Sequence, residues 1–506
     1  MGIRDYTIYD YLQHNASTAG SAPAAIRMDE TITYRQLLER VDRLSAGLTA
    51  SGITKGDRIC ILAQNSIEYL VLYGACAKTG AIAYPINWRL SAEEVEKVIQ
   101  LAQPKMLVTE SDHLSQLSVS DTSGIKVRAL IGPGSEEGFV SFSELYRNPQ
   151  EETFDVHSDD PFVILSTAAV AGEPRGAVLT HTNLIMAGYM LINALHLSPS
   201  DRNLAAMPLF HVSGLGMALN MIQVGGANVV LEKLDPVQAV KMMDEHAVTL
   251  VADFPPILSM LLDAKAATTA NLDSLKYVVG LDAPDVIRRL YMETGAKFWT
   301  GFGQSETSGV GTLVRVDEKA GATGKPLPLV RLRCVDEAGE DVPLHAIGEI
   351  VMQGPVVFAG YWRDADATQY TFRQGWHHTG DLGKLDEEGY LYYAGRKPEK
   401  ELIKSGGENI YPAEVEQVIQ DLPQVAAVCV IGIPDETWGE AVKAVVELIP
   451  GESLSEEQVR SAVAGRIASF KKPRYVAFVD KIPRTNEGDV DRAAVSAKFT
   501  RDPTTD

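Results

Sequence analysis

Residues that could handle a phosphorylated ligand gather between positions 301 and 409. In GFGQSET, Gly301 to Thr307, small glycines let the backbone approach a flat group, and Glu306 could hold a Mg²⁺ ion that bridges phosphates. Asp381 ends the tripeptide TGD, and its carboxylate could accept hydrogen bonds from two vicinal hydroxyl groups while Arg396 donates to the same ligand. These residue types suit a binding site for a phosphorylated, hydroxyl-bearing molecule; taken alone, they also fit a structural glycine-rich turn and a turn aspartate with a surface arginine.

The N-terminal half, which must position these residues, alternates between helix and strand. Helical spacing of apolar residues predicts a helix through Leu37, Leu38, Val41, Leu44 and Leu48. A buried strand is predicted at 58–62, a helix opened by a capping box at 91–94, and another strand at 105–109. Alternation of this kind favours α/β layers around a largely parallel sheet.

The pattern changes from about Gly321, where shorter strands alternate with Gly, Pro and Asp turns. A compact pattern of helices and strands follows Lys400. We therefore predict an α/β protein whose large N-terminal domain, residues 1–399, combines layered α/β subdomains with a β-rich subdomain. A small α+β C-terminal domain is predicted for residues 400–506.

Composition excludes several classes of protein. The 506 residues carry a formal net charge of −21, so a uniform nucleic-acid-binding surface is not expected. No apolar stretch is long enough to span a membrane, and the first residues do not resemble a signal peptide. The cysteines lack the spacing of metal ligands: Cys60, Cys76, Cys334 and Cys429. We expect a reduced, cytoplasmic protein.

Over nearly its whole length, the chain resembles the adenylate-forming superfamily of acyl-CoA synthetases, peptide-synthetase adenylation domains and luciferases. It is most similar to AMP-forming acyl- or aryl-CoA ligases. The segment TGDLGKLDEEGYLYYAGRKPEKELIKSGGENIYP, Thr379 to Pro412, carries the resemblance most densely. The resemblance implies that ATP, Mg²⁺ and coenzyme A are used and that a carboxylic acid is the substrate. It also implies that the small C-terminal domain is mobile and rotates between two steps.

The resemblance assigns roles to individual residues. Glu306 would be the Mg²⁺ ligand, and the catalytic group would comprise His211, Glu306, Lys404 and Arg175. Nucleotide and coenzyme binding would fall to Thr167, Gly172, Gly280, Ala283, Pro284, Phe302, Gly303, Ser305, Thr307, Asp381, Arg396, Gly406 and Gly407. Within that set, Phe302 would stack on adenine, Asp381 and Arg396 would clamp the ribose, and the two glycines after Ser405 would line the pantetheine tunnel.

The same resemblance gives the acyl pocket, whose expected residues are His211, Val212, Ser213, Asp253, Gly301 and Asn409. His211 would lie beside the substrate carboxylate and gate the pocket. Because acids are unusual in an apolar pocket, we expect Asp253 and Asp282 to point outward. The hinge would be Lys400, although two extra residues nearby leave Pro398 and Glu399 as alternatives. Lys404 could instead be a solvated lysine.

Two segments depart from the family's pattern. The phosphate loop reads TAAVAGEPRG, Thr167 to Gly176, so alanine and valine stand where glycine and hydroxyl residues are expected, and Arg175 stands where lysine is usual. The C-terminal motif places Asp489 in the position of a lysine that binds the acyl carboxylate and the α-phosphate. Candidates for a replacement cation are Lys404, Lys397 and Arg175.

The expected activity is therefore the activation of an apolar acid, fatty, alicyclic or aromatic, as acyl-AMP and its transfer to coenzyme A. Two alternatives remain. The acyl group could pass to an amine or a carrier protein, or the chain could be a nucleotide- or acyl-CoA-binding homologue with weak or mainly reverse activity. The identity of the acid and the oligomeric state stay open.

Overall fold

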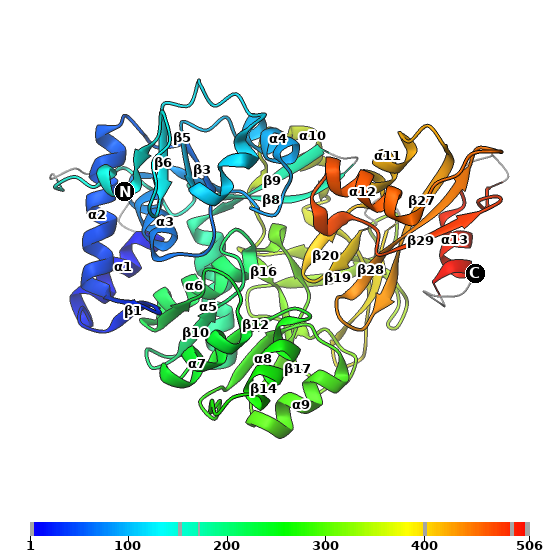
Figure 1. Cartoon of the computed structure of the whole chain (residues 1–506). Helices are drawn as coiled ribbons and strands as arrows, with labels where there is room; N and C mark the ends of the chain where they lie inside the picture. The colour runs from blue at the N-terminus through cyan, green and yellow to red at the C-terminus, as the bar shows by residue number, and fades with distance from the viewer. Residues whose placement is uncertain (1–4, 150–153, 171–172, 398–401, 486–489, 501–506) are drawn as a thin grey trace.

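A computed structural model describes residues 5–149, 154–170, 173–397, 402–485 and 490–500 (Figure 1). Several sequence expectations fall outside these ranges, namely those for Gly172, Pro398, Glu399, Lys400 and Asp489. None of the described helices is long and apolar enough to cross a membrane. The four cysteines are buried.

The first sheet of the N-terminal part has the strand order β21-β9-β8-β4-β3-β5-β6-β7. Its strands are β3 (Arg58–Leu62), β4 (Ile82–Pro85), β5 (Met106–Glu110), β6 (Val127–Ile131), β7 (Val140–Ser141), β8 (Pro161–Val170), β9 (Glu173–Thr180) and β21 (Gly360–Tyr361). The flanking helices are α1 (Ile8–Thr18), α2 (Tyr34–Ala50), α3 (Ile67–Thr79) and α4 (Ala92–Ala102). Strands β3 to β8 pair in parallel where the chain crosses over through helices, as the alternating sequence predicted.

The second sheet has the order β18-β17-β14-β13-β12-β10-β11-β1-β2. Its strands are β1 (Pro23–Arg27), β2 (Glu30–Thr33), β10 (Arg202–Ala205), β11 (Ala227–Val230), β12 (Leu250–Asp253), β13 (Tyr277–Gly280), β14 (Lys297–Thr300), β17 (Thr312–Arg315) and β18 (Lys325–Pro326). Its helices are α5 (His181–Leu195), α6 (Val212–Val224), α7 (Pro236–Glu245), α8 (Ile257–Ala266) and α9 (Pro284–Thr294). Strands β10, β12, β13 and β14 are parallel neighbours, so their carboxyl ends meet at one edge.

A smaller antiparallel sheet follows, as the shorter strands of the sequence predicted. It consists of β19 (Arg331–Val335), β20 (Gly348–Gln353), β22 (Phe372–Arg373), β23 (Trp376–Leu385) and β24 (Leu391–Arg396), with α10 (Ala365–Thr371) beside it. A two-stranded hairpin, β15 (Gly303–Gln304) and β16 (Gly309–Val310), lies next to β14 in the sequence.

The C-terminal part, orange to red in Figure 1, has its own sheet and two apolar clusters. Its elements are β25 (Ile403–Ser405), β26 (Glu408–Ile410), α11 (Pro412–Gln420), β27 (Val425–Asp435), β28 (Gly439–Leu448), α12 (Glu456–Arg466), β29 (Tyr475–Val479) and α13 (Arg492–Phe499). The predicted fold class is therefore confirmed: a large mixed α/β part precedes a small α+β part.

One local expectation is corrected. The segment expected to be a phosphate loop is mostly β-structure, because β8 continues to Val170 and β9 begins at Glu173. The two strands pair antiparallel, with Thr167 opposite Arg175. Ala169 stands where a glycine was expected and Val170 where a hydroxyl residue was expected, and both differences favour continuation of β8. The predicted helix after it does form, with Thr180 as the N-cap of α5.

Candidate active site

Asp381 and Arg396 lie opposite each other on neighbouring strands β23 and β24. Arg396 Nε donates to Asp381 Oδ1 at 2.9 Å, and the hydroxyl of Tyr393 donates to the same oxygen at 3.0 Å. The Gln304 side chain donates to Oδ2. Only 2% of Asp381 is exposed, so these contacts fix the direction of its carboxylate. The structure thus brings together the two residues expected to clamp a ribose.

Tyr393 was not expected in this site, although it lies three residues before Arg396. Its ring stacks on Phe302 with 6.3 Å between ring centroids and remains 42% exposed, whereas Phe302 itself is 6% exposed. The flat face available beside the Asp381 carboxylate is therefore largely that of Tyr393. Glycine is required around Phe302 because a Cβ atom at Gly303 would lie 1.9 Å from the carbonyl oxygen of Gly309.

Glu306 lies in the turn that joins β15 to β16 and is 9% exposed. Its carboxylate accepts a hydrogen bond from the Tyr361 hydroxyl at 2.8 Å. The guanidinium group of Arg175 lies 5.4 Å from the centre of the Tyr361 ring and forms an ion pair with Asp364 at 3.2 Å. Arg175 and Glu306 are therefore linked through Tyr361, which the sequence pattern did not single out.

The described part of the chain contains no cluster of three metal-ligating side chains. Mg²⁺ usually combines one or two carboxylates with substrate phosphates and water, so a lone Glu306 fits such an ion. The hydroxyl of Thr307, expected near phosphate, is occupied by the carbonyl oxygens of Gln304 and Gly309.

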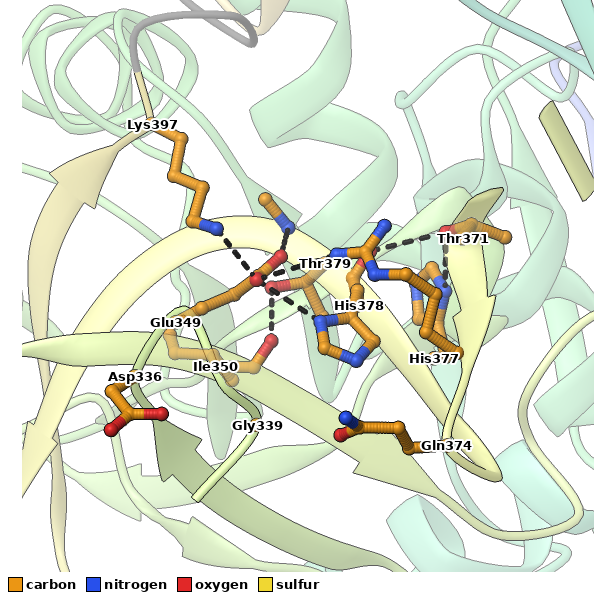
Figure 2. A network of polar contacts seen from close by, with 12 residues as sticks. Asp336, Gly339, Glu349, Ile350, Thr371, Gln374, His377, His378, Thr379 and Lys397 are labelled. Carbon is orange, nitrogen blue, oxygen red and sulfur yellow. Dashed lines mark hydrogen bonds and ion pairs between the residues drawn. The ribbon is translucent and has the colours of Figure 1, made fainter. Parts of the chain in front are cut away.

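Figure 2 shows a second polar network, centred on Glu349 of β20. Its carboxylate accepts hydrogen bonds from Lys397 Nζ at 2.8 Å, His378 Nδ1 at 3.0 Å and the backbone N–H of Gly380 at 3.1 Å. Burial raises the pKa of Glu349, but Lys397 and His378 outweigh it and hold the pKa below its usual value. Lys397 is thereby tied to β20, the neighbour of the strand β23 that carries Asp381.

The loop Ser405–Asn409 of the C-terminal part contacts the N-terminal part. Glu408 accepts from Asn87 at 3.0 Å and from Arg89 at 2.9 Å, and its carboxylate lies 3.6 Å from Nε2 of His211. Burial disfavours the charged form of Glu408, yet these partners hold its pKa below the usual range. Two residues far apart in sequence, His211 and Glu408, therefore meet at the site.

Three residues of the same loop were expected beside the ligands. Gly406 and Gly407 have φ values of 58° and 82°, which favour glycine, and they approach Trp438 and Phe254 respectively. Lys404 is partly exposed to solvent and lies close enough to Arg396 and Asp381 to interact with both; desolvation by the surrounding protein first, and then repulsion by Arg396, lower its pKa. Asn409 pairs with Lys404 across β25 and β26 and is exposed.

The remaining predicted residues lie where the parallel strands end. His211 follows β10 and is the N-cap of α6, which begins with Val212 and Ser213. Gly280 ends β13, Ala283 and Pro284 open α9, and Gly301 follows β14. Ligands of open α/β sheets bind at such carboxyl ends, so the common edge suits a pocket.

The expectation that Asp253 points outward is wrong. Asp253 is fully buried at the end of β12 and accepts a hydrogen bond from the backbone N–H of Leu258 at the start of α8. Its Oδ2 and that of the half-buried Asp282 are both enclosed, and the two carboxyl groups interact with each other. Burial and the neighbouring Asp282 raise the pKa of Asp253 well above its usual value.

Because Asp253 keeps its proton in the folded state at pH values where the unfolded chain has released it, its contribution to stability is lost as pH rises above about 4. At about pH 8, we expect Asp253→Asn to have a free energy of unfolding about 1–2 kcal/mol higher than that of the parent. The variant should therefore melt at a higher temperature at that pH, with little difference near pH 4. Circular dichroism melts at both pH values check this result. Asp285→Asn, an exposed neighbour, is the control; equal pH dependence of parent and Asp253→Asn would contradict the interpretation.

Comparison with protein-family models adds to this geometry. Residues 12–362 match the model of the AMP-binding enzyme, and residues 414–489 match that of the AMP-binding enzyme C-terminal domain. The chain belongs to the AMP-binding enzyme family. This confirms the resemblance to adenylate-forming enzymes.

Individual members of the AMP-binding enzyme family are similar over nearly the full length. An indoleacetate–CoA ligase of Aromatoleum aromaticum is 35% identical, over 93% of this chain and 94% of the relative. The amide bond synthetase McbA of Marinactinospora thermotolerans superposes with a TM-score of 0.87 and 25% identity, covering 98% of this chain and 100% of that one.

A third relative is o-succinylbenzoate CoA synthetase of Bacillus subtilis. The complex of a double mutant of that enzyme with the product analogue OSB-NCoA superposes with a TM-score of 0.84, 27% identity and coverage of 96% of this chain and 98% of that one. The enzyme's complex with the acyl-adenylate OSB-AMP gives 0.70, 26% identity and coverage of 97% and 98%. At nearly equal coverage, the TM-score shows that the present structure is more similar to the complex with OSB-NCoA than to the complex with OSB-AMP.

Proposed function

We propose that the protein is an AMP-forming acid–thiol ligase that activates an apolar carboxylic acid as acyl-AMP and transfers the acyl group to coenzyme A. The observation that carries the proposal is the position of Ser405–Asn409. This loop of the C-terminal part contacts His211 through Glu408 and brings Lys404 close to the Asp381–Arg396 pair. A site that joins a nucleotide clamp to a glycine-containing loop suits acyl transfer from a nucleotide.

In the first step, the substrate carboxylate oxygen attacks the α-phosphorus of ATP, and pyrophosphate leaves. Asp381 and Arg396 would orient the ribose, and Arg175 would offset phosphate charge. Glu306 would hold Mg²⁺, which when bound supplies positive charge next to the phosphates. These groups act through position and charge, and none of them needs to form a covalent bond.

In the second step, the thiolate sulfur of coenzyme A attacks the acyl carbon, and AMP leaves with the electrons of the broken carbon–oxygen bond. Glu408 draws His211 toward the C-terminal loop, and Gly406 and Gly407 leave space that larger side chains would fill. The similarity to the OSB-NCoA complex supports the view that the structure represents the orientation for this second step.

The proposed acid is apolar because the strand ends lie beside a cluster that includes Met207, Met217, Val279 and Phe302. An aromatic acid is the first choice, since the relative from Aromatoleum is named for indoleacetate. Aliphatic and alicyclic acids fit the same chemistry.

A second candidate is transfer of the acyl group to an amine, favoured by the structural similarity to an amide bond synthetase. The test is a panel of aromatic, alicyclic and straight-chain acids, each with ATP and Mg²⁺, and with coenzyme A, an amine or no acceptor. We expect AMP and pyrophosphate release that coenzyme A accelerates, with an acyl-CoA product identified by mass spectrometry. An amide as the only product would favour the second candidate; the absence of AMP from every acid would reject both.

A further inference from the structure

Glu94, at the start of helix α4, forms a contact between the two parts of the chain away from the proposed reacting groups. Its Oε1 accepts from Lys471 Nζ at 2.6 Å, and its Oε2 accepts from the backbone N–H of Ala468 at 2.9 Å. Lys471 also donates to Glu414 of α11 at 2.6 Å. We call these four residues the Glu94 clasp.

The clasp is largely shielded from solvent. The side chains of Lys471, Glu94 and Glu414 are 7%, 15% and 14% exposed. Burial disfavours the charged form of Lys471, but the two carboxylates outweigh it and raise its pKa. Exposed ion pairs contribute little free energy, whereas removing one partner of a buried pair is strongly destabilising. Because the clasp is largely buried, we expect it to affect domain orientation.

On the N-terminal side of the clasp, hydrogen bonds within its own helix cap hold the Glu94 side chain in place. Ser91 and Glu94 form a capping box, in which Glu94 Oε2 also accepts from the backbone N–H of Ser91 at 2.8 Å. The same short segment carries Asn87 and Arg89, which bind Glu408. One segment, residues 87–94, therefore holds the C-terminal part at two separate points.

We propose that the Glu94 clasp holds the C-terminal domain in the orientation that places Ser405–Asn409 at the active site, so that Glu94 and Lys471 are positioning residues for acyl transfer and not for adenylation. This inference rests on the proposed function. In an orientation that withdraws the loop from the site, Lys471 keeps Glu414, which moves with it, and loses Glu94.

Single-turnover measurements on the full chain separate the two steps. Acyl-AMP formation is followed as pyrophosphate release without coenzyme A, and transfer is followed by mixing the preformed enzyme–acyl-AMP complex with coenzyme A. We expect Glu94→Gln to slow transfer by about tenfold and to leave adenylation within about twofold. Adding Lys471→Met to Glu94→Gln should cause little further loss of transfer, because both changes remove the same contact.

Glu93→Gln is the matched control, since Glu93 is an exposed neighbour in the same helical turn, and it should change neither rate. Equal slowing of both steps by Glu94→Gln would show a general structural role and overturn the proposal. Unchanged transfer would also overturn it.

A distance measurement needs no turnover. Spin labels at Met292→Cys and Glu452→Cys, both exposed, report the distance between the two parts, and the native cysteines are buried. With coenzyme A present, Glu94→Gln should broaden or shift the distance distribution of the parent, and an unchanged distribution would overturn the proposal. If no acid is activated, the proposed function fails, while this measurement still decides whether the clasp sets the orientation.

Discussion

Asp381→Asn is expected to lower kcat/KM for ATP by about 100-fold while leaving the fold intact. The carboxylate directs Arg396, Tyr393 and Gln304 toward one point, and an amide can accept at only one of its two heavy atoms. Loss of a charge-assisted network of this kind corresponds to about 3 kcal/mol of transition-state stabilisation, which is about two orders of magnitude in rate. Initial rates of AMP release against ATP concentration measure the effect.

Tyr393→Phe is the matched control for this variant, because it removes one hydroxyl from the same carboxylate and keeps the ring on Phe302. Its loss should be less than about tenfold. A near-normal kcat/KM in Asp381→Asn, with an unchanged melting temperature, would contradict the assignment of Asp381 as a nucleotide ligand.

Asp489→Lys is expected to raise the rate of adenylation by about 10- to 100-fold. In the family's pattern this position holds a cation beside the acyl carboxylate and the α-phosphate, and charges about 4 Å apart interact by about 4 kcal/mol at an effective dielectric constant of 20. Part of that energy is lost to solvent and side-chain entropy, which gives the smaller range. Pyrophosphate release without coenzyme A measures the step.

Asp489→Asn removes the negative charge without adding a positive one, so it separates the loss of repulsion from the gain of a cation. Its adenylation rate should show only part of the increase expected for Asp489→Lys. If the lysine variant were no faster than the asparagine variant, another cation would already serve adenylation. Acyl transfer in preformed complexes should change little in either variant, because the expected role of this position belongs to the first step.

The three candidate replacement cations have different neighbours in the structure. Lys397 is bound to Glu349, and Arg175 forms an ion pair with Asp364. Lys404 lies within interaction range of Asp381 and Arg396. In the orientation that we propose for acyl transfer, Lys404 is therefore the candidate that lies beside the Asp381–Arg396 pair.

Much of the fold follows from local patterns in the sequence. Helix α2 and strand β3 were predicted because apolar periodicity and caps act over a few residues. The pairing of Asp381 with Arg396 was expected from the family motif and is present on adjacent strands. These features depend on short segments whose chemistry is visible without knowledge of the rest.

Features that depend on tertiary neighbours were missed. Nothing in the residues around Asp253 indicates that Asp282 and the N-terminus of α8 would enclose it. Tyr361 and Tyr393 resemble ordinary strand tyrosines until Glu306 and Asp381 are placed beside them. The capping role of Glu94 was predicted from its spacing to Ser91, but its contact with Lys471 joins positions 377 residues apart in sequence.

The double use of Glu94 Oε2 bears on how fast the two parts could separate. When Ala468 leaves, the same oxygen still caps the helix through the Ser91 N–H, and Lys471 still has Glu414. When the two parts separate, neither side of the clasp has to refold, and neither is left with an unpaired buried charge. The groups that become exposed are polar and can be solvated by water at once. Such a joint can open and close on the microsecond-to-millisecond scale of domain motions without local unfolding at each cycle.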